Sequence, residues 1–137
     1  YGLAQEGARE IRLVNRTLAR AREIAEQFGG PIKPLPWTDR HDALEGAAMV
    51  VNTTSQGMVG NGALDLRLDK LPQNALAADI VYIPLETPFL AAARKRGNRT
   101  INGLGMLLNQ GRPAWKAWFG IEPEVTAELR TMVEKTI

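Results

Sequence analysis

The stretch IRLVNRTLARA, residues 11–21, decides the fold of this 137-residue chain. An apolar run ends in three polar residues, Asn15, Arg16 and Thr17, and a helix-prone segment follows at once. This order is typical of the second strand of a dinucleotide-binding sheet, whose end meets the adenosine ribose. An acidic residue at that end selects NAD, whereas an arginine can pair with the 2′-phosphate of NADP. Because Arg16 and Arg20 stand there without a carboxylate, the stretch predicts an NADP site.

The same basic residues have a second interpretation. A guanidinium can hold a phosphate through two parallel hydrogen bonds, and Thr17 precedes a helix N-terminus, where backbone N–H groups favour anions. A solvated strand end followed by a basic helix face would show the same spacing. The stretch alone therefore leaves both interpretations open.

The composition narrows the class of protein. Hydrophobic residues make up 45% of the chain and charged residues 23%, as in a globular domain. The net charge is +2 and the basic residues are dispersed among acidic ones, so we expect no nucleic-acid partner. The chain has no cysteine and one histidine, His41, which argues against a metal site and fits a cytoplasmic protein. No apolar run approaches the length of about 18 residues that a membrane span needs, so we expect no membrane partner.

Strand-like and helix-like segments alternate along the chain. Short apolar runs predict strands, and apolar residues at helical spacing between glycines and prolines predict helices. This alternation predicts an α/β fold, with a Rossmann-like parallel sheet and helices on both of its faces. Pro113 should kink the longest helix. We expect strands at 10–14, 32–35, 47–51, 75–82 and 99–101, and helices at 1–6, 18–28, 39–44, 88–96, 106–119 and 122–135.

The first residues look like a later segment of such a fold rather than its first strand. Residues 1–7 look like the end of a helix closed by Gly7. In a Rossmann unit the glycine-rich phosphate loop lies about 20 residues before the ribose-binding residue, a position that falls before Tyr1. We therefore expect residues 1–137 to form one NADP-binding domain whose first strand and glycine-rich loop are missing from the chain.

A second polar cluster, NTTSQG at residues 52–57, follows an apolar strand directly. Open α/β sheets bind ligands at the carboxyl ends of their strands, so hydroxyls such as those of Thr54 and Ser55 could line a cofactor site. Side chains that merely complete a turn are the alternative, and they are the more frequent case for any single residue.

The third candidate is Gly103-Leu104-Gly105, which turns into the longest helix. Glycine there permits a close approach of the backbone to a ligand, although a lone GxG is a weak signal. Spacing alone places Gln110 on the surface of the helix and gives Tyr82, at a strand end, no definite role. Trp115 and Trp118 suggest core or domain packing rather than a stacking platform.

Taken together, these segments resemble the C-terminal, cofactor-binding domain of shikimate dehydrogenases. The resemblance covers essentially the whole chain. Its first motif is shared with other reductases, such as glutamyl-tRNA reductase, whereas the segment at 102–111 is far more specific. The matching segments are NRTLARA at 15–21, NTTSQGM at 52–58, DIVY at 79–82, TPFL at 87–90 and NGLGMLLNQG at 102–111.

The resemblance implies the reduction of 3-dehydroshikimate to shikimate with NADPH, in the pathway to chorismate and the aromatic amino acids. By resemblance, Tyr82 and Gln110 would contact the substrate's hydroxyls and carboxylate, a role for Gln110 that its spacing did not suggest. The other matched residues would bind the cofactor NADP: Asn15, Arg16, Thr17 and Arg20 at the 2′-phosphate, Thr54 and Ser55 along the molecule, and Ile80, Gly103 and Met106 near the nicotinamide.

The family's catalytic Lys and Asp belong to an N-terminal substrate domain, so the resemblance assigns no catalytic residue to this chain. Residues 104–137 would pack against that domain. The isolated chain should then show no turnover and weak NADP binding. A homodimer is a further partner that the sequence leaves open.

Three alternatives stay open at this stage. A quinate/shikimate dehydrogenase able to use NAD would be expected to carry an acidic residue near Arg16, which is not found. A nucleotide-binding homologue without catalysis would differ upstream of Tyr1. A glutamyl-tRNA reductase would need a nucleophilic cysteine and a basic surface, and the segment at 102–111 argues against it.

Overall fold

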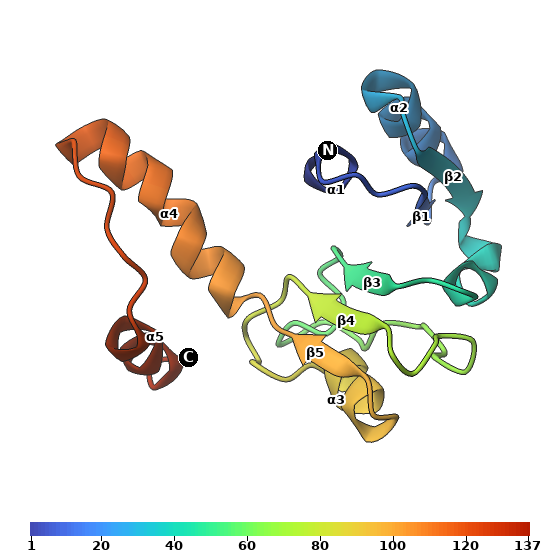
Figure 1. The fold of residues 1–137 in the computed structure, drawn as a ribbon. Coiled ribbons are helices and arrows are strands. Elements are labelled where there is room, and N and C mark those ends of the chain that lie inside the picture. The colour runs from blue at the N-terminus through green and yellow to red at the C-terminus, as the bar shows by residue number, and fades with distance from the viewer. The chain divides into compact units, whose positions relative to one another are not determined.

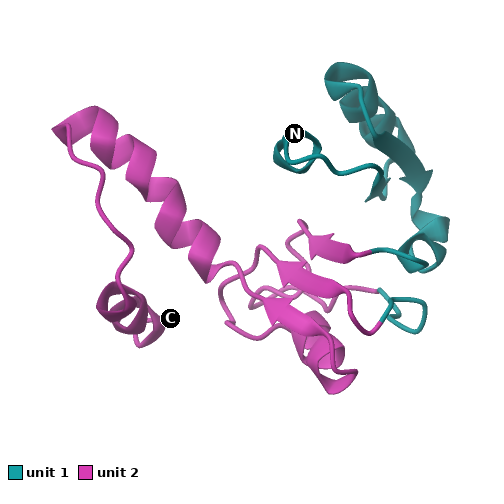
Figure 2. Ribbon diagram, in the orientation of Figure 1, with its two compact units in different colours: residues 1–47, 66–72 teal, residues 48–65, 73–137 magenta.

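A computed structural model describes all of residues 1–137, and their contacts divide the chain into two compact units. The first unit comprises Tyr1–Ala47 and Leu66–Pro72, and the second comprises Ala48–Asp65 and Gln73–Ile137 (Figure 2). Every strand pairing in both units is parallel, as the alternation of strands and helices predicted. None of the helices combines the length and the apolar character that a membrane crossing requires.

The first unit is built on a two-stranded parallel sheet (Figure 1). Its register runs from Ile11 opposite Ile32 to Asn15 opposite Pro36. Helix α2 packs on both strands, and Ala21, its one buried residue, has no accessible surface. The elements are α1 (Gly2–Gln5), β1 (Ile11–Asn15), α2 (Leu18–Phe28), β2 (Ile32–Pro36), and the short 3-10 helices η1 (Trp37–Asp39) and η2 (Asp42–Leu44).

The limits of β2 and α2 follow from the sequence. Helix α2 ends at Phe28 because Gly29 adopts a positive φ of 60°, which side chains rarely tolerate. Strand β2 carries two prolines, which cannot donate to a neighbouring strand, and it is an edge strand. The expected helix at 39–44 is replaced by η1 and η2, which are one turn each.

The second unit contains a three-stranded parallel sheet in the order β3-β4-β5 (Figure 1). Helix α3 packs on β4 and β5, and its residues Phe89, Leu90 and Ala93 are buried. Thr87 caps α3 by accepting a hydrogen bond from the Leu90 N–H. The elements are β3 (Met49–Asn52), β4 (Leu76–Asp79), α3 (Pro88–Lys95), β5 (Arg99–Ile101), α4 (Leu104–Phe119) and α5 (Ala127–Glu134).

One prediction about the last helices needs correction. Helix α5 begins at Ala127 rather than at residue 122, because the Thr126 hydroxyl caps it by accepting from the Leu129 N–H. Helix α4 runs through Pro113 as one continuous element, and the kink expected there stays a prediction. It ends at Phe119, and Gly120 closes it in the left-handed conformation with a φ of 73°.

Candidate functional site

The predicted phosphate-binding residues occupy the turn between β1 and α2 in the first unit. Asn15 is half-buried, and its Oδ1 accepts a hydrogen bond of 2.9 Å from the Thr17 N–H. This contact shapes the turn from which Arg16, Thr17 and Arg20 project as exposed side chains. Thr17 is the residue before α2, as predicted, but its hydroxyl does not cap the helix.

The two arginines of this turn are not used by the fold. Neither Arg16 nor Arg20 takes part in an ion pair or a side-chain hydrogen bond within the chain. By contrast, Arg12 in the same unit is held by Glu10 at 2.6 Å and by two backbone carbonyls. Two unengaged guanidiniums and a free hydroxyl beside a helix N-terminus form a donor set suited to an anion such as a phosphate.

In the second unit, the loop after β3 holds Thr54 and Ser55. The Thr54 hydroxyl donates to Asn52 Oδ1 at 2.8 Å and accepts from the Gln56 N–H at 3.1 Å. Its first role is therefore to complete the turn, the alternative that the sequence left open. The Ser55 side chain is exposed and makes no hydrogen bond within the chain.

The ends of β3 and β4 are joined by buried polar side chains. Asn52 and Asp79 are each 3% exposed, and Asn52 Nδ2 donates to Asp79 Oδ1 at 3.1 Å. Asp79 Oδ1 also accepts from the Val81 N–H, and Asp79 Oδ2 accepts from the Thr87 hydroxyl at 2.7 Å. Reasoning from the sequence assigned no role to Asp79. A carboxylate that ends an otherwise apolar strand is the signal that could have indicated one.

Gly103 lies against the backbone that follows β4. Its N–H donates to the Val81 carbonyl at 3.0 Å, and a Cβ at this position would lie 1.9 Å from the Ile80 carbonyl oxygen. Only glycine fits such a contact. The close approach expected of Gly103 is therefore made to the chain itself, and it brings the start of α4 to the end of β4.

The remaining predicted residues lie on the surface around this junction. Tyr82, directly after Val81, is half-buried and its hydroxyl has no hydrogen-bond partner within the chain. Met106 and Gln110 are exposed on α4, and the Gln110 amide is likewise unengaged. The structure thus joins the loop of Thr54 with Ile80 and Gly103, and it places Gln110 further along the helix that Gly103 begins. The turn of Asn15, Arg16 and Thr17 belongs to the first unit, and these residues belong to the second.

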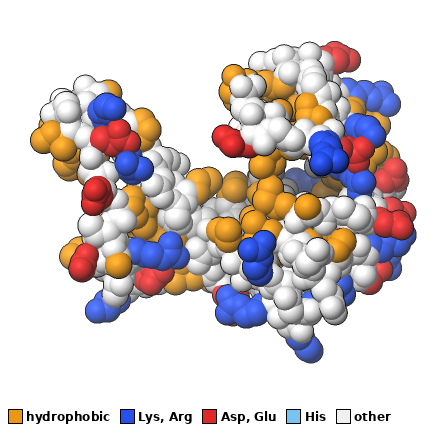
Figure 3. All heavy atoms as spheres, in the orientation of Figure 1, with side chains coloured by type: hydrophobic (Ala, Val, Ile, Leu, Met, Phe, Trp, Pro, Cys, Tyr) orange, Lys and Arg blue, Asp and Glu red, His pale blue; other side chains and the backbone are white.

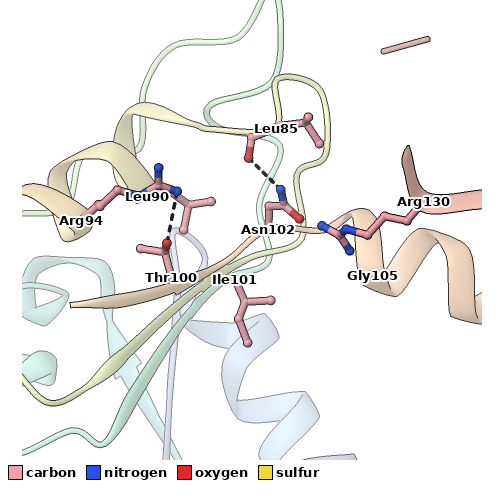
Figure 4. Close-up of a pocket in the computed structure, with 8 residues that line it drawn as sticks. All are labelled: Leu85, Leu90, Arg94, Thr100, Ile101, Asn102, Gly105 and Arg130. Atoms are coloured by element: carbon pink, nitrogen blue, oxygen red, sulfur yellow. Dashed lines mark hydrogen bonds between the residues drawn. The ribbon is translucent and has the colours of Figure 1, made fainter. Parts of the chain in front are cut away.

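A pocket of about 290 Å³ lies elsewhere in the second unit and contains none of the predicted site residues. Figure 4 shows the Arg94 side chain directed at Thr100, the Asn102 amide donating to the Leu85 carbonyl, and the Arg130 guanidinium pointing towards Asn102. Arg94 is paired with Glu86 at 3.0 Å, and Arg130 with Glu134 at 2.9 Å. Both cations are thus already neutralised by neighbouring carboxylates.

Helices α4 and α5 expose large apolar side chains (Figure 3). Trp115 and Phe119 contact each other with ring centroids 4.9 Å apart, yet Trp118 is 76% exposed. Such a surface usually marks an interface. The exposed apolar residues of this segment are Met106, Trp115, Trp118, Phe119, Ile121, Leu129, Met132 and Ile137.

The parallel sheets, their flanking helices and the polar residues at the strand ends define a Rossmann-like α/β protein. The family model described as shikimate / quinate 5-dehydrogenase matches residues 2–82, and the chain belongs to this family. The structure also resembles that of a shikimate dehydrogenase from Thermus thermophilus in complex with NADP(H) and shikimate. The TM-score is 0.74 and the identity 33%, over 97% of this chain and 46% of the other.

Two further proteins are similar to the chain over nearly its whole length. It is 52% identical to the shikimate dehydrogenase (NADP(+)) of Rhodopseudomonas palustris strain BisB5 over 98% of its own residues and 47% of the relative. A quinate dehydrogenase from Corynebacterium glutamicum, solved with NAD, matches with a TM-score of 0.87 at 26% identity, over 98% of this chain and 49% of the other. The chain therefore spans about half the length of the proteins it matches.

Proposed function

We propose that residues 1–137 are the cofactor-binding part of an NADP-dependent shikimate dehydrogenase, which reduces 3-dehydroshikimate to shikimate in the pathway to chorismate. The observation that carries the proposal is the exposed, unengaged pair Arg16 and Arg20 at the end of β1. Membership of the family and the NADP(+)-dependent relatives support it. The lack of a carboxylate in this turn favours NADP over the alternative of an NAD-dependent quinate/shikimate dehydrogenase.

The residues of the first unit would hold the adenosine end of the cofactor. Arg16 and Arg20 would bind the 2′-phosphate, and Asn15 and Thr17 would complete the site. Asn15 already contributes by shaping the turn through its bond to the Thr17 N–H. NADPH, when bound, supplies the hydride, and the protein supplies its position and surroundings.

The second unit would hold the rest of the cofactor and one side of the substrate. Thr54 and Ser55 would lie along the cofactor, with Ile80, Gly103 and Met106 near the nicotinamide. Tyr82 and Gln110 have a hydroxyl and an amide that no group of the chain engages, and we assign them to the substrate's hydroxyls and carboxylate. The resemblance assigns proton transfer to a Lys and an Asp of another domain, so the general acid and base would come from outside these residues.

That other domain would also cover the exposed surface of α4 and α5. The exposed fraction of Trp118 and the apolar residues beside it support residues 104–137 as the surface that packs against it. Strand β1 pairs with β2 alone and β3 pairs with β4 alone, so each of these two strands keeps one edge without a partner strand. We propose that chain outside residues 1–137 supplies the first strand and the glycine-rich loop. A biosynthetic enzyme without cysteines in this region fits a cytoplasmic location.

The proposal is tested with the full-length protein that contains this chain. Oxidation of shikimate is followed by the absorbance of the reduced cofactor, with NADP+ and NAD+ compared, and with quinate as the competing substrate. We expect turnover of shikimate with NADP+, a clear preference over NAD+, and no turnover by residues 1–137 alone. Activity with NAD+ but not NADP+, or robust shikimate oxidation by residues 1–137 alone, would contradict the assignment.

A further inference from the structure

The buried carboxylate of Asp79 connects three segments of the second unit. It accepts hydrogen bonds from Asn52 Nδ2 at 3.1 Å, from the Val81 N–H at 3.0 Å and from the Thr87 hydroxyl at 2.7 Å. The three donors come from the end of β3, the turn after β4 and the residue that caps α3. No lysine or arginine forms an ion pair with Asp79, so these donors are its partners in the interior.

The contact with Asp79 also decides which way the Asn52 amide faces. Asn52 Nδ2 donates to Asp79 and to the Gln56 carbonyl, which leaves Oδ1 to accept from both the N–H and the hydroxyl of Thr54. The opposite orientation would place an NH₂ group against two donors and an oxygen against the carboxylate. Asp79 thereby fixes the turn that carries Thr54 and Ser55.

The same carboxylate fixes the turn after β4. Its bond to the Val81 N–H holds the backbone between Ile80 and Tyr82, and the Val81 carbonyl in turn accepts from Gly103. The loop after β3 also packs directly on Thr87, because a Cβ at Gly57 would lie 3.3 Å from the Thr87 side chain. The turn that carries Thr54 and Ser55, the turn after β4 and the start of α4 are thus all held by the buried carboxylate of Asp79.

We propose that Asp79 is a positioning residue for the reaction, acting through Asn52 and Thr87 on the groups that contact cofactor and substrate. This inference rests on the proposed function for the identity of those ligands. The proposal gives Asp79 no direct contact with the cofactor or the substrate, because its carboxylate is bonded to three groups inside the protein.

Conservative variants separate positioning from simple stability. Asp79→Asn keeps the size of the side chain but replaces one of its two acceptor oxygens with an NH₂ group, which then faces a hydrogen-bond donor. Thr87→Val removes one of those donors, whereas Thr87→Ser retains the hydroxyl. The matched control is Asn98→Ala, because Asn98 is a buried amide of the same unit, 4% exposed, which donates to the Gln73 and Ala75 carbonyls before β4.

The experiment compares these variants in the full-length protein by kcat/KM for shikimate oxidation and by amide hydrogen exchange at Thr54 and Val81. We expect Asp79→Asn to lower kcat/KM by about tenfold or more and to speed exchange at both amides. Thr87→Val should lower kcat/KM in the same direction, with activity restored in Thr87→Ser. Asn98→Ala should lower the melting temperature with kcat/KM and the two amides unchanged.

The inference is overturned if Asp79→Asn behaves like Asn98→Ala, with lower stability, unchanged kcat/KM and unchanged exchange at the two amides. Absence of shikimate turnover in the wild-type protein would refute the proposed function instead. The exchange rates at Thr54 and Val81 would then still decide whether Asp79 holds both turns.

Discussion

Replacing Gly103 by alanine should destabilise the protein, because a Cβ there meets closer contacts than at any other glycine of the chain. A Cβ at this position would lie 1.9 Å from the Ile80 carbonyl oxygen and 2.4 Å from its carbon, and ordinary contact begins at 3.4 Å. The backbone would have to separate by roughly 1.5 Å, the difference between 3.4 and 1.9 Å. Such a movement breaks the 3.0 Å bond from Gly103 to the Val81 carbonyl, and both partners are buried.

Overpacking costs about 1–3 kcal/mol, and a buried group left without its partner costs about 1–3 kcal/mol more. We therefore expect Gly103→Ala to lower the free energy of unfolding by about 3 kcal/mol or more, measured by urea denaturation. The control is Gly111→Ala in α4, where a Cβ meets nothing within 4 Å and should stabilise the helix by about 0.5–1 kcal/mol. If Gly103→Ala unfolds within about 0.5 kcal/mol of the wild type, the close contact does not exist.

Two further predictions concern surface groups. The Lys70 ammonium, 2.7 Å from Asp42, lowers the pKa of that carboxyl below its ordinary value and has its own pKa raised by the same hydrogen bond. The stability contributed by Asp42 should be lost as the pH falls through its lowered pKa, and that of Lys70 as the pH rises through its raised pKa. NMR titration of Lys70→Met should return the pKa of Asp42 towards its ordinary value; an unchanged value would refute the pairing. Thr126→Ala removes the cap from the Leu129 N–H and should cost α5 about 1 kcal/mol in stability, measured by circular dichroism. The pKa of Glu128, lowered first by its own backbone N–H and then by Thr126, should rise partway in that variant, whereas an unshifted pKa would exclude the contact.

Much of the fold could be predicted because local patterns coincide with the packing that the structure adopts. The polar residues after β1, the proline and threonine that begin α3, and the glycine that ends α4 each act within a few residues of their own position. The start of α5 was predicted wrongly because two local signals compete there. Pro123 is a common first residue of a helix, but the hydroxyl of Thr126 provides the actual cap.

The rest depends on contacts between distant residues, which no local pattern records. Asp79 meets Asn52 across 27 positions, and Gly103 meets Ile80 across two elements. Residue types alone present these as an ordinary carboxylate and a weak glycine motif. In the structure, these two residues hold together the carboxyl ends of β3 and β4 and the start of α4.

The most direct test of the cofactor site compares NADP+ with NAD+ in the double variant Arg16→Ala/Arg20→Ala of the full-length protein. Charge-assisted hydrogen bonds contribute about 1.5–3 kcal/mol, so kcat/KM for NADP+ should fall by about a hundredfold with the value for NAD+ unchanged. Arg22 is exposed and lies in α2 with Arg20, and Arg22→Ala should leave both kcat/KM values unchanged. An equal loss for the two cofactors, or no loss for either, would contradict a 2′-phosphate site at the end of β1.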